Sequence, residues 1–192
     1  MSTKKIKNLE FKLIESAISI VEMEGPENLS VRSVAAKAGC SIGTLYNYFR
    51  DMNELILKIN SKTLLKLQKA ISRATSQQHS KSLLGRTLAK EYLGFALDNL
   101  PFWNLLFKYK VPKDQKMPKW YLDIIDENFR LLESALRPHI DAKHTHVSSR
   151  VLWGACHGII LLSIEGKLDI ASPESAETLC EALFENYLKG CK

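Results

Sequence analysis

Residues 30–52, SVRSVAAKAGCSIGTLYNYFRDM, decide the fold, because they predict two short helices joined by a sharp turn. The helices are expected over 31–38 and 42–49, and each follows a serine that can cap its N-terminus. Gly39 breaks the first helix and supplies the positive φ that a tight turn requires. The stretch therefore predicts a helix-turn-helix.

The second helix of this pair carries an unusual mixture of side chains for its length. Serine, threonine, asparagine and tyrosine side chains can hydrogen-bond to base edges and phosphates in a major groove, and an isoleucine can make an apolar contact there. An ordinary helical hairpin within a core is the alternative, but it does not explain two tyrosines and a polar face. The residues expected to face DNA are Ser41, Ile42, Thr44, Tyr46, Asn47 and Tyr48.

Helical periodicity continues on both sides of this stretch. A first helix carries apolar residues over 9–21 and ends at Gly25-Pro26, and Asp51 is expected to cap a fourth helix that fades by Arg73. No alternating strand of useful length appears. The sequence therefore predicts an all-α fold of about nine helices. The later helices are expected over about 81–99, 101–109, 118–137, 145–167 and 173–190.

The composition narrows the class of protein. Of the 192 residues, 45 % are hydrophobic and 25 % charged, as expected for a soluble chain that buries a core. Residues 1–75 hold 12 Lys and Arg against 7 Asp and Glu, whereas residues 76–192 hold 15 against 14, which indicates a polyanion-binding module in the first part. No apolar run approaches the roughly 18 residues of a membrane span, and no signal-peptide pattern is seen, so we expect a cytoplasmic protein without membrane contact.

The run Gly39-Cys-Ser-Ile-Gly-Thr-Leu-Tyr-Asn-Tyr-Phe49, followed by Glu54-Leu55, resembles the DNA-binding signature of TetR-family transcriptional regulators. The resemblance covers about residues 6–60. It implies an all-α homodimer with an N-terminal three-helix DNA head and a C-terminal ligand-binding and dimerising domain. We accordingly expect a helix-turn-helix domain over 1–52, a connecting helix over 53–75 and a ligand-binding and dimerisation domain over 76–192.

The resemblance also implies roles for single residues. It adds Arg32, which would reach a base or a phosphate, and Gly43, which would face base edges together with Ile42 and Thr44. Ser41 would touch the DNA backbone, Tyr46 and Tyr48 would bond phosphates, and Asn47 could do either. One position departs from the family pattern: Met52 stands where many relatives carry a phosphate-binding lysine. The cations expected to replace that lysine are Arg50, Lys4, Lys5 and Lys7.

The C-terminal part contains most of the aromatic residues, and some of them are expected to line an effector pocket. The segments 92–97 and 103–107 and the unit Trp153-Gly-Ala-Cys-His157-Gly158 resemble one C-terminal subgroup of TetR regulators, which implies a small-molecule effector, expected to be largely apolar. His157 shares a helix face with Trp153 and is either a ligand anchor or a buried, satisfied histidine. The pocket candidates are Phe95, Trp103, Phe107, Tyr121, Ile125, Phe129, Trp153 and His157.

Two glycines in the same helix indicate a dimer interface. Gly154 and Gly158 each cost about 1 kcal/mol relative to alanine inside a helix, so together they suggest a close helix crossing. With the last helix they predict a four-helix bundle between two copies. The interface candidates are Gly154, Gly158, Leu162, Ala176, Leu179, Cys180, Leu183 and Tyr187.

The remaining constellations indicate no catalysis. The histidines of 139–146 lack a reliable metal-ligand spacing, so neither metal nor cofactor is expected, and no nucleophile elbow or phosphate loop points to an enzyme.

A basic loop is expected to be solvated, with an anionic effector or a membrane surface as alternatives; it contains Lys108, Lys110, Lys113, Lys116 and Lys119. The sequence favours a homodimeric DNA-binding regulator, expected to be a repressor. The alternative is a helical ligand- or partner-binding sensor with a non-functional DNA head.

Overall fold

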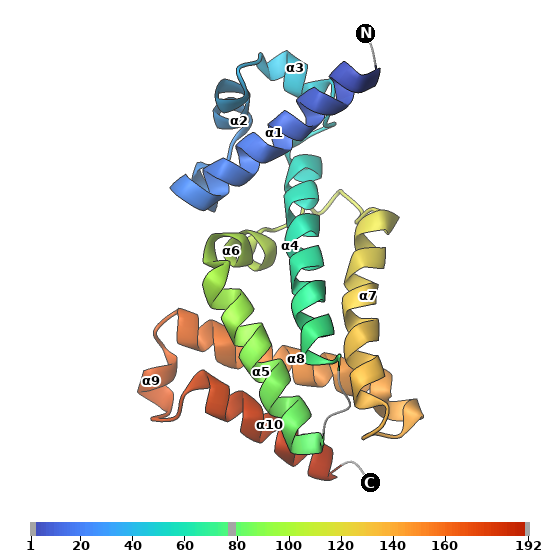
Figure 1. Ribbon diagram of the computed structural model, residues 1–192. Coiled ribbons are helices and arrows are strands. Elements are labelled where there is room, and N and C mark those ends of the chain that lie inside the picture. The colour runs from blue at the N-terminus through green and yellow to red at the C-terminus, as the bar shows by residue number, and fades with distance from the viewer. Residues whose placement is uncertain (1–2, 77–79, 191–192) are drawn as a thin grey trace. The chain divides into compact units, whose positions relative to one another are not determined.

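The computed structural model describes residues 3–76 and 80–190, and all regular structure within them is helical, which confirms the all-α prediction (Figure 1). The chain forms two compact units, the first made of Met1–Thr63 and Asn99–Tyr121 and the second of Leu64–Asp98 and Leu122–Lys192. The described helices are α1 (Thr3–Glu24), the 3-10 turn η1 (Pro26–Asn28), α2 (Val31–Ala38), α3 (Ile42–Tyr46), α4 (Met52–Ala74), α5 (Lys81–Asp98), α6 (Leu100–Lys108), α7 (Lys119–Leu136), α8 (Ala142–Ile164), α9 (Leu168–Ala171) and α10 (Ala176–Gly190).

The helix-turn-helix is built from local hydrogen bonds. Ser30 caps α2 in a reciprocal arrangement, in which its Oγ accepts from the Ser33 N–H at 3.1 Å and Ser33 Oγ accepts from the Ser30 N–H at 3.0 Å. Gly39 ends α2 with φ 67°, a conformation in which a β-carbon would be strained. The predicted cap and turn are therefore confirmed.

Helix α3 ends earlier than predicted. Helix was expected to position 49, but α3 ends at Tyr46. The N–H groups of Tyr48 and Phe49 both bond to the Leu45 carbonyl, at 3.0 and 3.1 Å, so the chain tightens into a turn instead of adding a regular helical residue.

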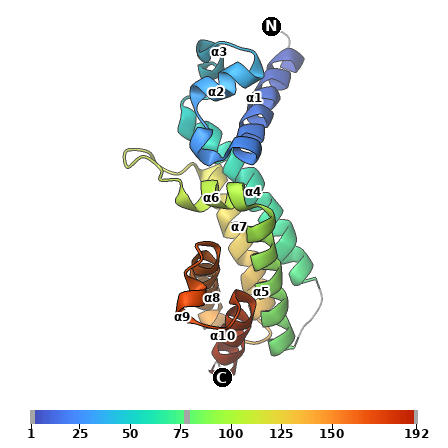
Figure 2. The same ribbon diagram turned by 90° about the vertical axis from the view of Figure 1, so that its left-hand side faces the viewer.

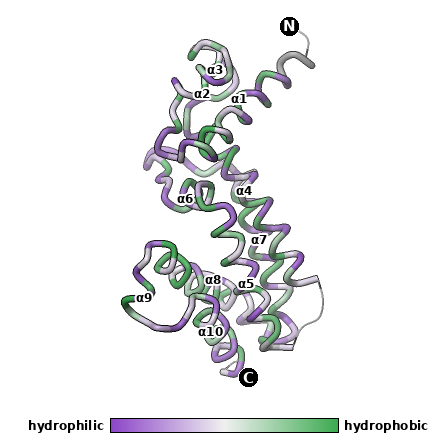
Figure 3. The backbone as a smooth tube through the Cα atoms, turned by 60° about the vertical axis from the view of Figure 1, so that its left-hand side comes forward, coloured by the Kyte–Doolittle hydropathy of each residue, from purple (hydrophilic) through white to green (hydrophobic). Residues whose placement is uncertain are grey.

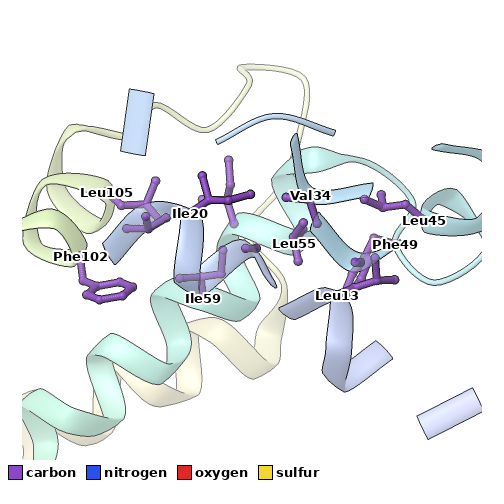
Figure 4. Close-up of a cluster of buried hydrophobic side chains, with 13 residues drawn as sticks. Leu13, Ile20, Val34, Leu45, Phe49, Leu55, Ile59, Phe102 and Leu105 are labelled. Carbon is purple, nitrogen blue, oxygen red and sulfur yellow. The ribbon is translucent and has the colours of Figure 1, made fainter. Parts of the chain in front are cut away.

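A cluster of apolar side chains holds the first unit together (Figure 4). It takes members from α1, α2, α3, α4 and α6, among them Leu13, Val34, Leu45, Leu55 and Phe102. Complete burial of such a side chain is worth about 1.5–3 kcal/mol relative to exposure. Around α4, hydrophobic and hydrophilic residues alternate as an amphipathic helix requires (Figure 3). The residues of α6, far away in sequence, are thus part of the core that supports α3.

The second unit is held by close packing of α5 and α10. A β-carbon at Gly85 of α5 would lie 2.5 Å from Cβ of Phe184 on α10, so this approach requires glycine. The neighbouring Arg86 donates to Glu181 Oε1 through Nε at 2.8 Å and Nη2 at 2.6 Å. α8 packs on the same helix, and Cys180 Sγ of α10 lies 3.9 Å from the Cys156 carbonyl oxygen of α8.

α8 begins three residues before the predicted helix, because Asp141 caps it by accepting the Lys143 N–H at 3.1 Å. It ends before Gly166, which has φ 65°, and the short α9 that follows was not predicted. By length and composition α8 could cross a membrane, with a mean hydropathy of 1.4 over 18 residues, but a packed helix of a soluble protein passes the same test.

Candidate nucleic-acid interface and aromatic cluster

α3 has one anchored side and one open side. Leu45 is completely buried in the core of the first unit, whereas Tyr46 and Ile42 expose 49 % and 41 % of their surface. All the sequence-predicted contacts on and around α3 reach the surface of this unit. The exposed ones are Ser41, Ile42, Gly43, Tyr46 and Asn47, and the half-buried ones are Thr44 and Tyr48.

The first turn of α3 holds two hydroxyls in fixed positions. Ser41 Oγ accepts the Thr44 N–H at 3.1 Å and lies 2.8 Å from Thr44 Oγ1, where either hydroxyl can donate. A hydroxyl has one donor and two acceptor positions, so each keeps capacity for a further hydrogen bond. The two hydroxyls therefore help to cap α3 and also present polar groups in fixed positions at its N-terminus.

Gly43 is exposed in the first turn of α3. A β-carbon there would meet only Ser41 Oγ, at 3.8 Å, which is ordinary contact. The packing of the chain itself therefore does not require glycine, although glycine costs about 1 kcal/mol relative to alanine in a helix. The position leaves room for another molecule to approach the α3 backbone closely.

The cations and Met52 are placed around α3. Arg32 is exposed in the first turn of α2, and the largely exposed Arg50 guanidinium lies 3.3 Å from Asp51 Oδ2. Met52 is half-buried against the apolar cluster of the first unit, which accounts for an apolar residue there. The side chains of Lys4, Lys5 and Lys7 lie outside the described residues.

A hydrogen-bonded chain that the sequence did not reveal joins the start of α4 to the loop between α6 and α7. Tyr109 Oη donates to Asn53 Oδ1 at 3.0 Å, and Asn53 Nδ2 donates to Gln115 Oε1 at 2.6 Å. Gln115 Nε2 then donates to Asp51 Oδ2 at 2.9 Å. Because the partners are more than 50 positions apart, no local spacing could have predicted these contacts.

Asp51 is therefore bonded from several directions. Its Oδ1 accepts the Glu54 N–H at 2.8 Å, and Glu54 Oε2 accepts the Arg50 N–H at 2.9 Å, so the predicted cap of α4 is confirmed. Burial acts to raise the pKa of Asp51, but the hydrogen bonds from Glu54 and Gln115 and the Arg50 guanidinium outweigh it and lower that pKa below its usual value. The carboxylate is ionised at neutral pH and holds the first turn of α4.

In the second unit, three residues from α5 and α8 form a hydrogen-bond chain. Trp153 Nε1 donates to Tyr92 Oη at 2.9 Å, and Tyr92 Oη lies 3.1 Å from His157 Nδ1. Burial lowers the pKa of His157, which is therefore neutral at pH 7, and burial raises the pKa of Tyr92. The indole can only donate, so the Tyr92 hydroxyl accepts from Trp153, while the tautomer of His157 decides whether Tyr92 Oη or His157 Nδ1 donates in the bond between them.

Further aromatic contacts extend this group. The Trp153 ring stacks on His157 with centroids 5.6 Å apart and meets Phe129 edge-on at 5.5 Å. The Arg150 guanidinium lies 4.3 Å from the Phe129 ring centroid. The structure thus brings together three predicted pocket residues and adds Tyr92, which belongs to the segment that resembles the TetR subgroup. We call Tyr92, Phe129, Trp153 and His157 the aromatic cluster.

The other pocket candidates are placed elsewhere. Phe95 is buried and Ile125 half-buried in the second unit. Trp103 and Tyr121 are buried in the first unit, where the Phe107 ring lies 4.5 Å from that of Trp103. The candidates therefore fall into two groups that belong to different units of the chain.

The dimer candidates also separate into two kinds. On α8, Gly154 is exposed and Gly158 half-buried, and a β-carbon at either would have nothing within 4 Å. Ala176 and Cys180 are buried in the packing of α10 within the chain, so their side chains are not at its surface. The remaining candidates are the exposed Leu162 and the half-buried Leu179, Leu183 and Tyr187.

Among the described residues, no group of three or more His, Cys, Asp or Glu is arranged to hold a metal ion. Cys40, Cys156 and Cys180 are free thiols, and Cys191 lies outside the described residues.

Two family models match the chain in consecutive segments. The one described as "Bacterial regulatory proteins, tetR family" matches residues 13–59, and the one described as "Tetracyclin repressor-like, C-terminal domain" matches residues 86–187, more than half of the chain. No curated protein matches it.

Solved structures share the fold along nearly the whole chain. A protein of unknown function from Rhodococcus sp. RHA1 matches with a TM-score of 0.75 at 23 % identity over 95 % of both chains. PfmR, a TetR family transcriptional regulator from Thermus thermophilus, matches with a TM-score of 0.60 at 20 % identity over 94 % of this chain and 98 % of its own. The fatty acid degradation regulator FadR from Bacillus halodurans matches with a TM-score of 0.65 at 12 % identity over 95 % of both chains.

At these identities the structural matches show a shared fold, while the family models identify both the helix-turn-helix segment and the helical C-terminal segment. The chain therefore belongs to the TetR family of bacterial transcriptional regulators.

Proposed function

We propose that the chain is a homodimeric, sequence-specific DNA-binding repressor that a small-molecule effector releases from its operator. Functionally it divides into a DNA-binding domain over 1–52, a connecting helix over 53–75 and a ligand-binding and dimerisation domain over 76–192. Two recognition helices about 34 Å apart would enter successive major grooves of a palindromic operator. Such a protein acts in the bacterial cytoplasm, where its operator is.

The observation that carries this proposal is the open face of α3. Leu45 anchors the helix in the core, while Ile42, Thr44 and Tyr46 reach the surface. The exposed Gly43 has no packing role within the chain, and a glycine there allows the helix to approach base edges closely. In this arrangement Tyr46 and Tyr48 contact phosphates, Ile42, Gly43 and Thr44 face base edges, and Arg32 and Asn47 contact either a base or a phosphate.

An apolar stripe on α8 supports dimerisation. Val147, Val151 and Leu162 expose 61 %, 45 % and 41 % of their surface, and they lie at helical spacing with Gly154 and Gly158. Exposed valines and leucine cost free energy in water unless a partner covers them. A second α8 laid against this stripe, with Leu179 and Leu183 of α10 at its side, would form a four-helix bundle.

The aromatic cluster supports effector binding in the second unit. It combines apolar ring surface with the polar groups of Tyr92 and His157, which is the composition of small-molecule sites. An effector that binds one arrangement of the helices more tightly than the DNA-competent one would shift the population and release DNA.

Gel retardation with the neighbouring intergenic DNA tests DNA binding, and footprinting on the same DNA locates the operator. We expect the wild type to retard it with an affinity that falls steeply with salt. Tyr46→Ala and Thr44→Ala are each expected to weaken specific binding about tenfold or more, because each removes a hydrogen bond to DNA. Ile170→Ala, at the 85 % exposed Ile170 of the second unit, is the matched control and should bind normally.

Normal binding by both α3 variants would mean that the recognition helix is misassigned. If the wild type retards no intergenic DNA and its thermal melt is unchanged by that DNA, the alternative is favoured, a ligand or partner sensor with a non-functional head.

A further inference from the structure

The loop over 109–118, between α6 and α7, belongs to the same unit as the helix-turn-helix. It passes beside the N-terminal turn of α4 (Figures 1 and 2). Sequence alone suggested a solvated basic loop of the C-terminal part. Its placement next to the DNA-contacting elements changes what its charges can do.

A specific anchor holds the loop in this place. Gln115 uses both ends of its amide, accepting from Asn53 Nδ2 at 2.6 Å and donating to Asp51 Oδ2 at 2.9 Å. Asn53 is only 5 % exposed and also accepts from Tyr109 Oη at 3.0 Å, so the loop is bonded to the start of α4 at Tyr109 and again at Gln115. Hydrogen bonds to a buried amide and to a carboxylate are costly to break. The loop is therefore fixed relative to Asp51, which directly follows Arg50.

The anchored loop carries unpaired positive charge. Lys110, Lys113 and Lys116 are exposed, and within residues 3–76 and 80–190 no ion pair is formed by any of them. The only acid in 109–118 is Asp114, which leaves a net charge of +2 from three lysines and one aspartate. Like charges held close together repel each other, and a polyanion relieves that repulsion.

Residues 51–54, which the structure describes at the start of α4, include no cation. Met52 packs against the apolar cluster, and the Arg50 guanidinium is shared with Asp51 at 3.3 Å. A lysine side chain extending from the loop anchored at Asp51 can supply positive charge to the same region. The loop has no exposed large apolar side chain that could insert into a lipid surface, because Val111 and Met117 are half-buried.

We propose that Lys110, Lys113 and Lys116 form a second DNA-contacting element, which binds backbone phosphates beside the half-site read by α3. The proposal rests on the proposed function, since it assigns the loop to the same DNA complex. Phosphate contacts carry no direct sequence information, so the loop contributes affinity and salt dependence while α3 sets specificity.

The test compares Lys110→Gln, Lys113→Gln and Lys116→Gln in one protein with the wild type, on the footprinted operator and on an unrelated duplex. The measured quantity is the slope of log K against log salt concentration. Each lost phosphate contact is expected to reduce the magnitude of the slope by about 0.9, so a homodimer that loses one to three contacts per protomer should lose roughly 2 to 5 on both duplexes. The ratio of operator to unrelated-duplex affinity should stay within about twofold of the wild type, because α3 is unchanged.

The matched control is Lys69→Gln, Lys90→Gln and Arg137→Gln in one protein. These three exposed residues lie in the second unit, and their replacement removes the same charge. The control should keep the wild-type slope on both duplexes. Circular dichroism melts should show that both triple variants fold as the wild type does, since all six side chains are exposed.

Several results would overturn the proposal. Equal slopes for the loop variant and the wild type would show that the lysines touch no phosphate, and an equal loss in the control would show an effect of net charge alone. Binding of the wild type to anionic lipid vesicles that the loop variant loses, with DNA slopes unchanged, would assign the loop to a membrane surface instead.

A wild type that binds operator and unrelated DNA equally well would contradict the proposed function without contradicting the role of the loop. In that case the slope on the unrelated duplex still decides whether the loop binds phosphates. A wild type that binds no duplex at all overturns both.

Discussion

The helices α3 and α8 use polar side chains in opposite ways. α3 buries Leu45 and presents hydroxyls at its surface, whereas α8 buries Ser149 and Thr145 and exposes Val147. The buried hydroxyls of α8 bond to backbone carbonyls of their own helix, Thr145 Oγ1 to Asp141 at 3.2 Å and Ser149 Oγ to His146 at 2.8 Å. The hydroxyls of α3 suit a surface that faces water or DNA, whereas α8 exposes apolar side chains, which a second copy covers in the dimer proposed above. The pattern of polar and apolar residues along a helix therefore indicates which side faces water only when every partner of that helix is taken into account.

The largest expected effect distinguishes the anchored and open sides of α3. Leu45→Ala should reduce the free energy of unfolding by about 2–5 kcal/mol, because it leaves a cavity in a fully buried site. Ile42→Ala, on the exposed side of the same helix, should change it by less than about 0.5 kcal/mol. Urea unfolding of both variants provides the measurement. Similar losses for both would show that α3 is not divided into a buried and an open side.

The next effect compares two glycines of the second unit. Gly85→Ala should destabilise the fold by about 1–3 kcal/mol, since its β-carbon would lie 2.5 Å from Cβ of Phe184. Gly154→Ala meets no atom of its own chain within 4 Å and should leave the unfolding of the isolated chain unchanged or improve it by up to about 1 kcal/mol.

If α8 forms the dimer interface, however, Gly154→Ala should weaken dimerisation. Sedimentation equilibrium of the Gly85→Ala and Gly154→Ala proteins measures the association between copies directly. A Gly154→Ala protein that associates as tightly as the wild type would move the interface away from this stripe.

The smallest effect concerns pH and the aromatic cluster. Burial lowers the pKa of His157, so below about pH 6.5 the unfolded chain binds a proton that the folded chain does not. The free energy of unfolding should therefore fall as the pH is lowered from about 7 to about 5.5. A protonated ring can only donate at Nδ1, so protonation also fixes the direction of its hydrogen bond with Tyr92 Oη.

Thermal melts at the two pH values test this expectation. His157→Gln should reduce the difference in melting temperature between them, whereas His144→Gln, at an exposed position, should keep the wild-type difference. An unchanged difference in His157→Gln would mean that another group causes the pH dependence.

Local features of the fold were predictable because they depend on residues a few positions apart. Ser30, Gly39 and Asp51 act as caps or turns through bonds to neighbours within four residues, and these predictions were confirmed. The end of α3 was missed by three residues, because the bonds of Tyr48 and Phe49 to one carbonyl form a turn that propensity does not distinguish from helix.

Contacts between distant segments were not predictable in the same way. The pairing of Gln115 with Asp51, and of Tyr92 with Trp153, joins residues more than 60 positions apart. Helical periodicity also placed Cys180 at a surface stripe, although α10 buries it against the chain. A single apolar face looks the same whether its partner is in the same chain or in another copy.

From the amino acids alone one could read where each helix of the DNA head begins, which side chains α3 offers and which family signature they form, since capping, turn geometry and helical spacing operate over short stretches of backbone. Three-dimensional packing was needed to bring the lysine-rich loop beside α4, to assemble the ring and hydroxyl groups of α5 and α8, and to leave Val147 and Val151 uncovered. Those outcomes depend on which surfaces meet when the helices are buried together, and burial is a property of the folded molecule that no short segment contains.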